Sequence, residues 1–272
     1  MKKIFISFAL LICIYSNCFA HKEWVHQYMV QEAYKMLQNQ VGINTNIFEP
    51  TQFGINSSGA NFYGDGNFQN DDPWITTQPI VTGAWWEDNQ DIVWGYKTFL
   101  VYPTSGDASV CHFWMADNGD YQQTYLSAPP WSFNAYNAYD KAQKLLFPGT
   151  NNNKEIIINH SGSINVPVGI GQWTIKHNVS EWKITYNDIF DLYQDNFTIE
   201  EYQTTTGWHN ITWTINNNII GVSGKDLALQ ILGRVAHLLG DMSVPAHTHG
   251  VAHPCPVGYG DYYELDLGNS LV

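Results

Sequence analysis

The sequence predicts a mainly α-helical domain that carries a β-containing insertion between residues 150 and 222. Three segments predict the helical part: 21–40 and 224–240, where apolar residues recur at helical spacing, and 135–146. Alternating or β-branched apolar runs predict the strands of the insertion: 156–158, 173–175 and 211–215. With 44% hydrophobic residues in 272, the chain can bury one sizeable core.

The first twenty residues have the features of a secretory signal peptide. Two lysines follow the initiator methionine, the apolar run Ile4–Ile14 is too short to cross a bilayer, and small residues precede Ala20. We therefore expect cleavage after Ala20 and a secreted or periplasmic mature domain over residues 21–272. An uncleaved membrane anchor or a lipoprotein linkage at Cys18 is the alternative.

The other elements follow from local sequence signals. Residues 50–82 are rich in Gly, Asn, Pro and Asp and predict loop, followed by short ordered segments near 84–91 and 110–115. Pro148 and Gly149 close the helix over 135–146. The asparagine runs 151–153 and 216–218 indicate turns or loop tips. The widest apolar face belongs to 224–240, the clearest helix of the chain.

The net charge of −13 argues against a protein that reads nucleic-acid sequence, because an acidic protein is repelled by polyanions. An enzyme with a local cationic site remains compatible with this charge, since bound metal ions bring positive charge of their own.

A cluster of histidine and aspartate lies at the end of the last helix and in the segment after it. His237 and Asp241 lie one helical turn apart on the same face, Pro245 ends the helix, and His247 and His249 come next. So many polar groups beside an apolar helix are costly unless something binds them, and imidazole with carboxylate suits a divalent metal. The alternative is a satisfied core histidine followed by a surface loop.

The spacing of His237, Asp241 and His247, with Gly240 and Pro245 between, resembles the core signature of the zinc-dependent phospholipase C and single-strand nuclease superfamily. The resemblance implies a helical phospholipase C/nuclease-type domain with a cluster of three zinc ions. It also implies that the mature N-terminus ligates metal, through the backbone of His21 and the side chain of His26. The family usually begins with tryptophan, from which His21 departs.

Two further ligands are implied by a tryptophan-rich turn and a later histidine. The turn over 84–88 supplies Asp88, with Glu87 and Asp91 as alternatives, and the histidine is His112. The resemblance makes Asp88 and Asp241 the catalytic residues: Asp241 bridges two ions, and Asp88 orients or deprotonates the attacking water.

The last family ligands are a histidine and an acidic residue four positions later. Glu264 fits the acid, but Gly260 stands where the histidine is expected, so His253 or His249 is the candidate replacement. His247 and Glu264 would hold the third ion. The same resemblance brings the neighbours of two cysteines together, so we expect a disulfide between Cys111 and Cys255, with zinc ligation by thiolates as the alternative.

The resemblance implies hydrolysis of phosphodiesters by metal-activated water. Glu264, in place of aspartate, and the acidic chain favour a phospholipase C-like enzyme that cleaves phospholipid headgroups and contacts membrane surfaces transiently. A single-strand nuclease or 3'-nucleotidase is the alternative, and a secreted zinc-binding protein without catalysis is the second. No sequence-specific binding of nucleic acid is expected.

Overall fold

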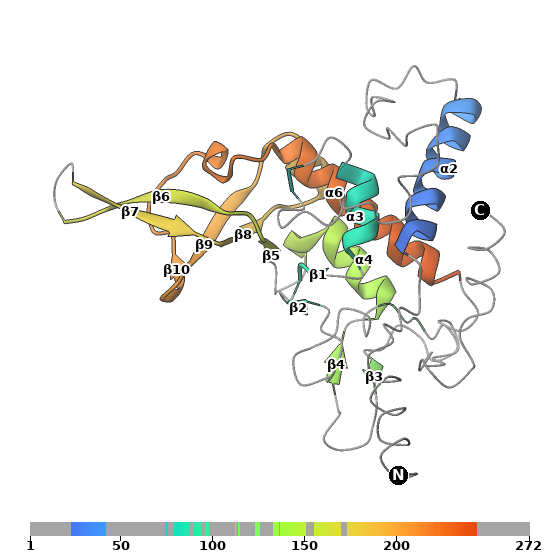
Figure 1. The fold of residues 1–272 in the computed structure, drawn as a ribbon, viewed down its shortest axis with the longest axis horizontal. Helices are drawn as coiled ribbons and strands as arrows, with labels where there is room; N and C mark the ends of the chain where they lie inside the picture. Colours follow the sequence, from blue (N-terminus) through green and yellow to red (C-terminus); the bar gives the residue numbers. More distant parts are fainter. Residues whose placement is uncertain are drawn as a thin grey trace, which may run out of the picture.

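The computed structural model describes most of residues 137–243 and shorter pieces of the chain before them. The described residues are 23–41, 74–75, 79–87, 90–93, 96–97, 112, 114, 123–125, 133–135, 137–150, 155–169 and 173–243. Within these ranges helices and strands are both prominent, so the mainly α fold class is wrong and the described part is a mixed α and β structure. A helical body carries an arm of antiparallel strands (Figure 1).

The helices gather around the last one. The α-helices are α2 (Glu23–Val41), α3 (Pro79–Trp86), α4 (Ala138–Leu146), α5 (Ile189–Tyr193) and α6 (Gly224–Asp241). The 3-10 helices are η5 (Pro148–Thr150) and η6 (Asn217–Ile220). Helix α6 packs against the other four. It begins at the N-cap Ser223, whose Oγ accepts a hydrogen bond from the Asp226 amide at 3.1 Å.

All strand pairs among the described residues are antiparallel. The strands are β1 (Gln90–Asp91), β2 (Tyr96–Lys97), β3 (Gln123–Tyr125), β4 (Phe133–Ala135), β5 (Ile156–Ile158), β6 (Gly162–Pro167), β7 (Thr174–Val179), β8 (Glu181–Thr185), β9 (Thr198–Thr204) and β10 (Gly207–Asn210). The largest sheet has the order β10-β9-β8-β5, while β6 and β7 form a separate hairpin.

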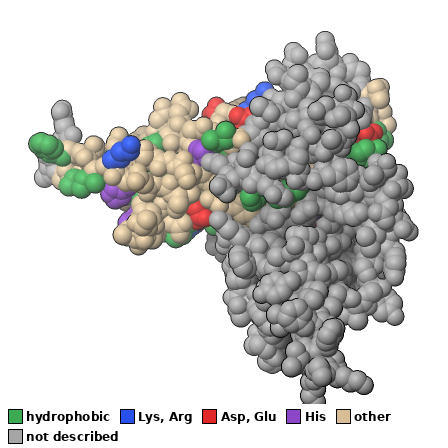
Figure 2. All heavy atoms as spheres, viewed as in Figure 1, with side chains coloured by type: hydrophobic (Ala, Val, Ile, Leu, Met, Phe, Trp, Pro, Cys, Tyr) green, Lys and Arg blue, Asp and Glu red, His purple; other side chains and the backbone are tan. Residues whose placement is uncertain are grey.

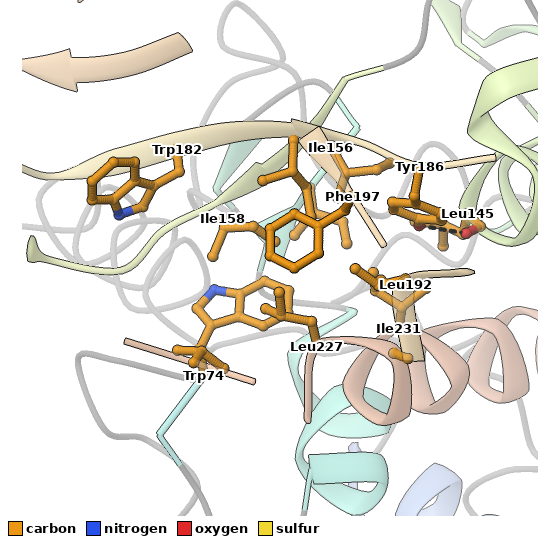
Figure 3. Close-up of a cluster of buried hydrophobic side chains, with 14 of the residues drawn as sticks. Trp74, Leu145, Ile156, Ile158, Trp182, Tyr186, Leu192, Phe197, Leu227 and Ile231 are labelled. Atoms are coloured by element: carbon orange, nitrogen blue, oxygen red, sulfur yellow. Dashed lines mark hydrogen bonds between the residues drawn. The ribbon is translucent and has the colours of Figure 1, made fainter. Parts of the chain in front are cut away.

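The strands and the helices share one hydrophobic core. Ile156 and Trp182 from the sheet and Leu192 from α5 belong to the same buried cluster as Leu227 and Ile231 from α6 (Figure 3). The expected fold class fails for this reason: the strands after residue 150 are not an addition to a helical core but supply much of that core.

The predicted helices and most predicted strands are confirmed. The segments 21–40 and 224–240 correspond to α2 and α6, and the runs 156–158 and 173–175 correspond to β5 and β7. The helix expected over 135–146 begins later, at Ala138, because β4 extends to Ala135.

The strand predicted over 211–215 is wrong. The Ile211 amide donates to the Glu200 carbonyl at 2.8 Å, but no ladder continues beyond it. The alternation of apolar residues has another cause, because Ile211, Trp213 and Ile215 pack half-buried against the core from an irregular segment. None of the helices in the described ranges is both long and apolar enough to span a bilayer.

Candidate metal centre

His237 and Asp241 meet at the C-terminal end of α6, as their spacing predicts. The His237 Nε2 lies 3.2 Å from the Asp241 Oδ2, and both side chains are fully buried. Because the two residues are one turn apart on a regular helix, the helix itself fixes their relative position.

His26 comes to the same carboxylate from α2. Its Nε2 lies 3.5 Å from the Asp241 Oδ1, and its ring stacks on that of His237 with centroids 3.6 Å apart. The approach depends on Gly240, where a β-carbon would lie 3.2 Å from the His26 Nδ1. Ligand atoms of His26, His237 and Asp241 all lie within 4.8 Å of one another, so this buried group could hold a metal ion.

His112 adjoins the same group. Its Nδ1 lies 2.9 Å from the Asp241 Oδ2 and 3.3 Å from the His237 Nε2, and the side chain is fully buried. Three of the expected histidine ligands, from three distant parts of the sequence, are thus brought to one aspartate.

The backbone of α3 sets the orientation of the His237 ring. A carbonyl only accepts hydrogen bonds, so the His237 Nδ1 must donate to the Ala84 carbonyl at 2.6 Å. This leaves the Nε2 as the nitrogen that faces Asp241 and that could ligate a metal ion. A backbone carbonyl behind an imidazole is the arrangement that orients histidine ligands in metal sites.

Two glycines permit this close approach of α3 to α6. A β-carbon at Gly83 would lie 1.9 Å from the Gln230 carbonyl oxygen, and one at Gly233 would lie 1.9 Å from the Ile80 carbonyl oxygen. Only glycine fits at either position, so the helix backbones touch there. The crossing lies one turn before His237 and carries the Ala84 carbonyl to it.

The charge of the centre is concentrated on Asp241. Burial alone would raise the pKa of its carboxyl, but the imidazoles of His237, His112 and His26 outweigh burial and hold the pKa well below its usual value. Asp241 is therefore an ionised, fully buried carboxylate, which is the form that ligates a metal.

The donor atoms suit zinc in type and spacing. Zinc takes nitrogen and oxygen ligands at about 2.0–2.1 Å, so two ligand atoms in a tetrahedral site lie about 3.3 Å apart. The separations of 3.5 Å between His26 Nε2 and Asp241 Oδ1 and 3.2 Å between His237 Nε2 and Asp241 Oδ2 agree with that value. The group could therefore hold a metal ion that takes nitrogen and oxygen ligands.

A second buried cluster of charges borders the centre. The Glu87 Oε1 contacts the Lys141 Nζ, and the Glu87 Oε2 lies 3.3 Å from the Arg234 Nη1. The Lys141 Nζ also lies 3.5 Å from the Asp91 Oδ2. All four side chains are fully buried. We call Glu87, Asp91, Lys141 and Arg234 the buried ion quartet.

Glu87 and Asp91, the two alternatives to Asp88 as a metal ligand, both belong to the buried ion quartet. Glu87 and Asp91 each lie against a buried cation, and the Glu87 Oε1 lies 3.9 Å from the His112 Nε2 at the border of the centre. Arg234 also donates to the Gln90 carbonyl at 2.6 Å. The quartet therefore fastens the segment after α3 to α4 and α6.

Sequence reasoning missed the quartet and the Ala84 carbonyl. The available signal was Arg234, a cation on the wide apolar face of the last helix, which needs a buried counter-charge.

The remaining predicted site residues lie outside the described part of the chain. They are His21, Asp88, His247, His249, His253, Glu264, Cys111 and Cys255. The signal peptide over 1–20 lies outside it as well.

Comparison with known proteins gives no family assignment: no protein-family model, curated protein or solved structure matches the chain.

Proposed function

We propose that the protein is a secreted zinc-dependent phosphodiester hydrolase of the phospholipase C-like kind. The observation that carries the proposal is the meeting of His26, His237 and Asp241 in one buried group, with His112 beside it. These are residues that the superfamily resemblance assigns to its metal cluster. Chance burial of three histidines around one carboxylate, from α2, α6 and the segment at 112, is a poor alternative, because each buried polar group would cost free energy.

Zinc is the proposed ion, because the donors are nitrogen and oxygen at tetrahedral spacing. A bound zinc ion would supply positive charge to the phosphodiester and lower the pKa of coordinated water to about 7. The three-ion cluster is part of the proposal, with Asp88, His247 and Glu264 as its remaining side-chain ligands.

The described residues have separate tasks in this scheme. Asp241 supplies the one negative charge of the buried group, and both of its oxygens face imidazole nitrogens. The hydrogen bond from the His237 Nδ1 to the Ala84 carbonyl fixes the orientation of the ring, so the Nε2 stays directed at Asp241. Glu87 and Asp91 together balance the charges of Lys141 and Arg234 beside the centre, which limits their repulsion of a metal ion.

Hydrolysis of bis(p-nitrophenyl) phosphate by the purified mature protein tests the proposal. We expect activity that a chelator removes and zinc restores, and that His237→Ala abolishes. His209→Ala, on β10 away from the centre, is the matched control and should keep wild-type activity. Activity that resists chelation would contradict the metal mechanism, and no activity in the zinc-loaded protein would favour a non-catalytic zinc-binding role.

The substrate class is tested separately. Phosphatidylcholine and single-stranded DNA should be offered to the same zinc-loaded preparation. Release of phosphocholine is expected; faster cleavage of DNA would move the protein to the nuclease branch.

A further inference from the structure

The β6–β7 hairpin projects from the body as a ribbon of two strands. Its register pairs Ile164 with His177 and Val166 with Ile175, and beyond the strands the Val168 amide donates to the Trp173 carbonyl at 3.0 Å. Figure 1 shows the hairpin at the far left, at the opposite end of the molecule from α2.

The two faces of this ribbon differ sharply. Side chains alternate between the faces of a strand, and residues paired across a hairpin share a face. One face carries, apart from His177 and Gly162, only apolar residues: Ile164, Val166, Val168, Trp173, Ile175 and Val179. The other face consists of Ser163, Asn165, Pro167, Thr174, Lys176 and Asn178.

The apolar face continues along the hairpin past the part that packs into the hydrophobic core. At its base, Ile164 and Val179 are buried and belong to the core. Toward the tip, Val168 is 43% exposed, Ile175 54% and Trp173 82%. We call Val168, Trp173 and Ile175 the tip patch; Figure 2 shows hydrophobic side chains at this end of the molecule. An exposed cluster of large apolar residues rimmed by polar ones is typical of an interaction site.

The charge of the hairpin differs from that of the chain. The chain has 25 acidic residues in 272, but the segment 156–180 contains none, and Lys176 is its only lysine or arginine. An acidic protein is repelled by the negative surface potential of many membranes. The acid-free hairpin is therefore a part of this acidic protein that can approach a lipid surface without that repulsion.

The chemistry of the tip patch fits a bilayer interface better than a second protein. Tryptophan, apolar in its ring and polar at its N–H, is enriched at the headgroup level of membranes. A second copy of the chain is a weaker candidate, because a standard interface buries about 800 Å² on each partner. Trp173, the largest member, supplies at most about 250 Å².

We propose that the tip patch inserts into the headgroup region of a phospholipid bilayer and holds the protein at the membrane surface. Trp173 and Ile175 enter the boundary between headgroups and acyl chains, while Lys176 on the opposite face stays in water. This attachment needs no catalysis, so it can hold or fail independently of the hydrolase proposal.

Flotation of the full mature protein with phosphatidylcholine vesicles, in the presence of a chelator, tests this attachment without hydrolysis. We expect the wild type to bind and Trp173→Ser/Ile175→Ser to bind at least about tenfold more weakly, since two exposed apolar side chains are removed. Both residues are largely exposed, so the variant should fold, which circular dichroism checks.

Phe190→Ser is the matched control, because Phe190 is an equally prominent aromatic residue on α5, 74% exposed and outside the hairpin. It should bind vesicles like the wild type. Equal binding by the double variant, or no binding by the wild type, would overturn the proposal. A double variant that changes the sedimentation coefficient from dimer to monomer would overturn it too, and would make the tip patch an interface between copies.

Discussion

The ring of His26 stacks on the ring of His237 at a centroid separation of 3.6 Å, which joins the first and the last described helices at one carboxylate. Both rings also face the same side chain, because the His26 Nε2 lies 3.5 Å from the Asp241 Oδ1 and the His237 Nε2 lies 3.2 Å from the Asp241 Oδ2. The stacked pair therefore presents two imidazole nitrogens beside one carboxylate, the donor types that zinc takes.

Asp241→Asn should lower metal affinity at least about tenfold while leaving the metal-free protein folded. The amide keeps the shape of the carboxylate but removes the one negative charge that faces three imidazoles. Calorimetric titration with zinc measures the affinity. Asp226→Asn, in the first turn of the same helix, is the control and should bind zinc normally. Unchanged affinity in Asp241→Asn would mean that the ion is held elsewhere.

Glu87→Gln should destabilise the protein by about 3–5 kcal/mol, because it leaves the buried Lys141 and Arg234 with too little negative charge. The free energy of unfolding in urea measures the effect. The same change at Glu201, whose partner Lys183 is partly exposed, should cost about 1 kcal/mol or less. Equal losses in the two variants would show that the quartet contributes no more than a surface pair.

Gly233→Ala should destabilise the protein by about 1–3 kcal/mol, although alanine is the better helix former, because its β-carbon would overlap the Ile80 carbonyl. Separation of α3 from α6 would also move the Ala84 carbonyl from the His237 Nδ1 and weaken zinc binding. Leu239→Ala is the control: it changes an exposed residue of the same helix and should leave the contact between α3 and α6 intact. A more stable Gly233→Ala variant would contradict the close crossing.

Tyr186 should make the protein lose stability above pH 10. Burial raises the pKa of its phenol above the usual value of 10.0, and its Oη donates to the Leu145 carbonyl at 2.6 Å. With the folded pKa raised, the unfolded chain ionises first, so this contribution is complete below pH 10 and falls by roughly 1.4 kcal/mol per pH unit above it.

Urea unfolding at pH 9, 10 and 11 measures this slope. Tyr186→Phe should be less stable at pH 9 by about 1 kcal/mol, the value of one hydrogen bond, but should lose less on going to pH 11. Tyr139→Phe, which removes a half-buried phenol from α4, is the control. Identical slopes for wild type and Tyr186→Phe would contradict the buried phenol.

The sequence predicted elements well where local pattern and tertiary environment agree. Helix α6 has an N-cap, an apolar face and no internal proline, so the pattern from Leu227 to Leu238 was sufficient. The segment from Ile211 to Ile215 shows the limit. Its period of two reports that alternate side chains face the core, but not whether a neighbouring strand is present to pair with it.

The fold class failed on a relationship that periodicity does not encode. Nothing in the pattern of Trp182 or Ile156 says that they pack on Leu227 of α6 and not on a separate core. The centre was more predictable, because the spacing of His237 and Asp241 and the resemblance named His26 and His112 in advance. The buried ion quartet was not predictable, because ion pairs between residues far apart in the sequence produce no regular spacing in it.

Anomalous diffraction at the zinc edge, from crystals of the zinc-loaded protein, tests the central claim most directly. We predict a peak about 2.0–2.2 Å from the Nε2 atoms of His26 and His237 and from an Asp241 carboxylate oxygen. Zinc-loaded crystals with no anomalous peak at these three residues would contradict the metal centre.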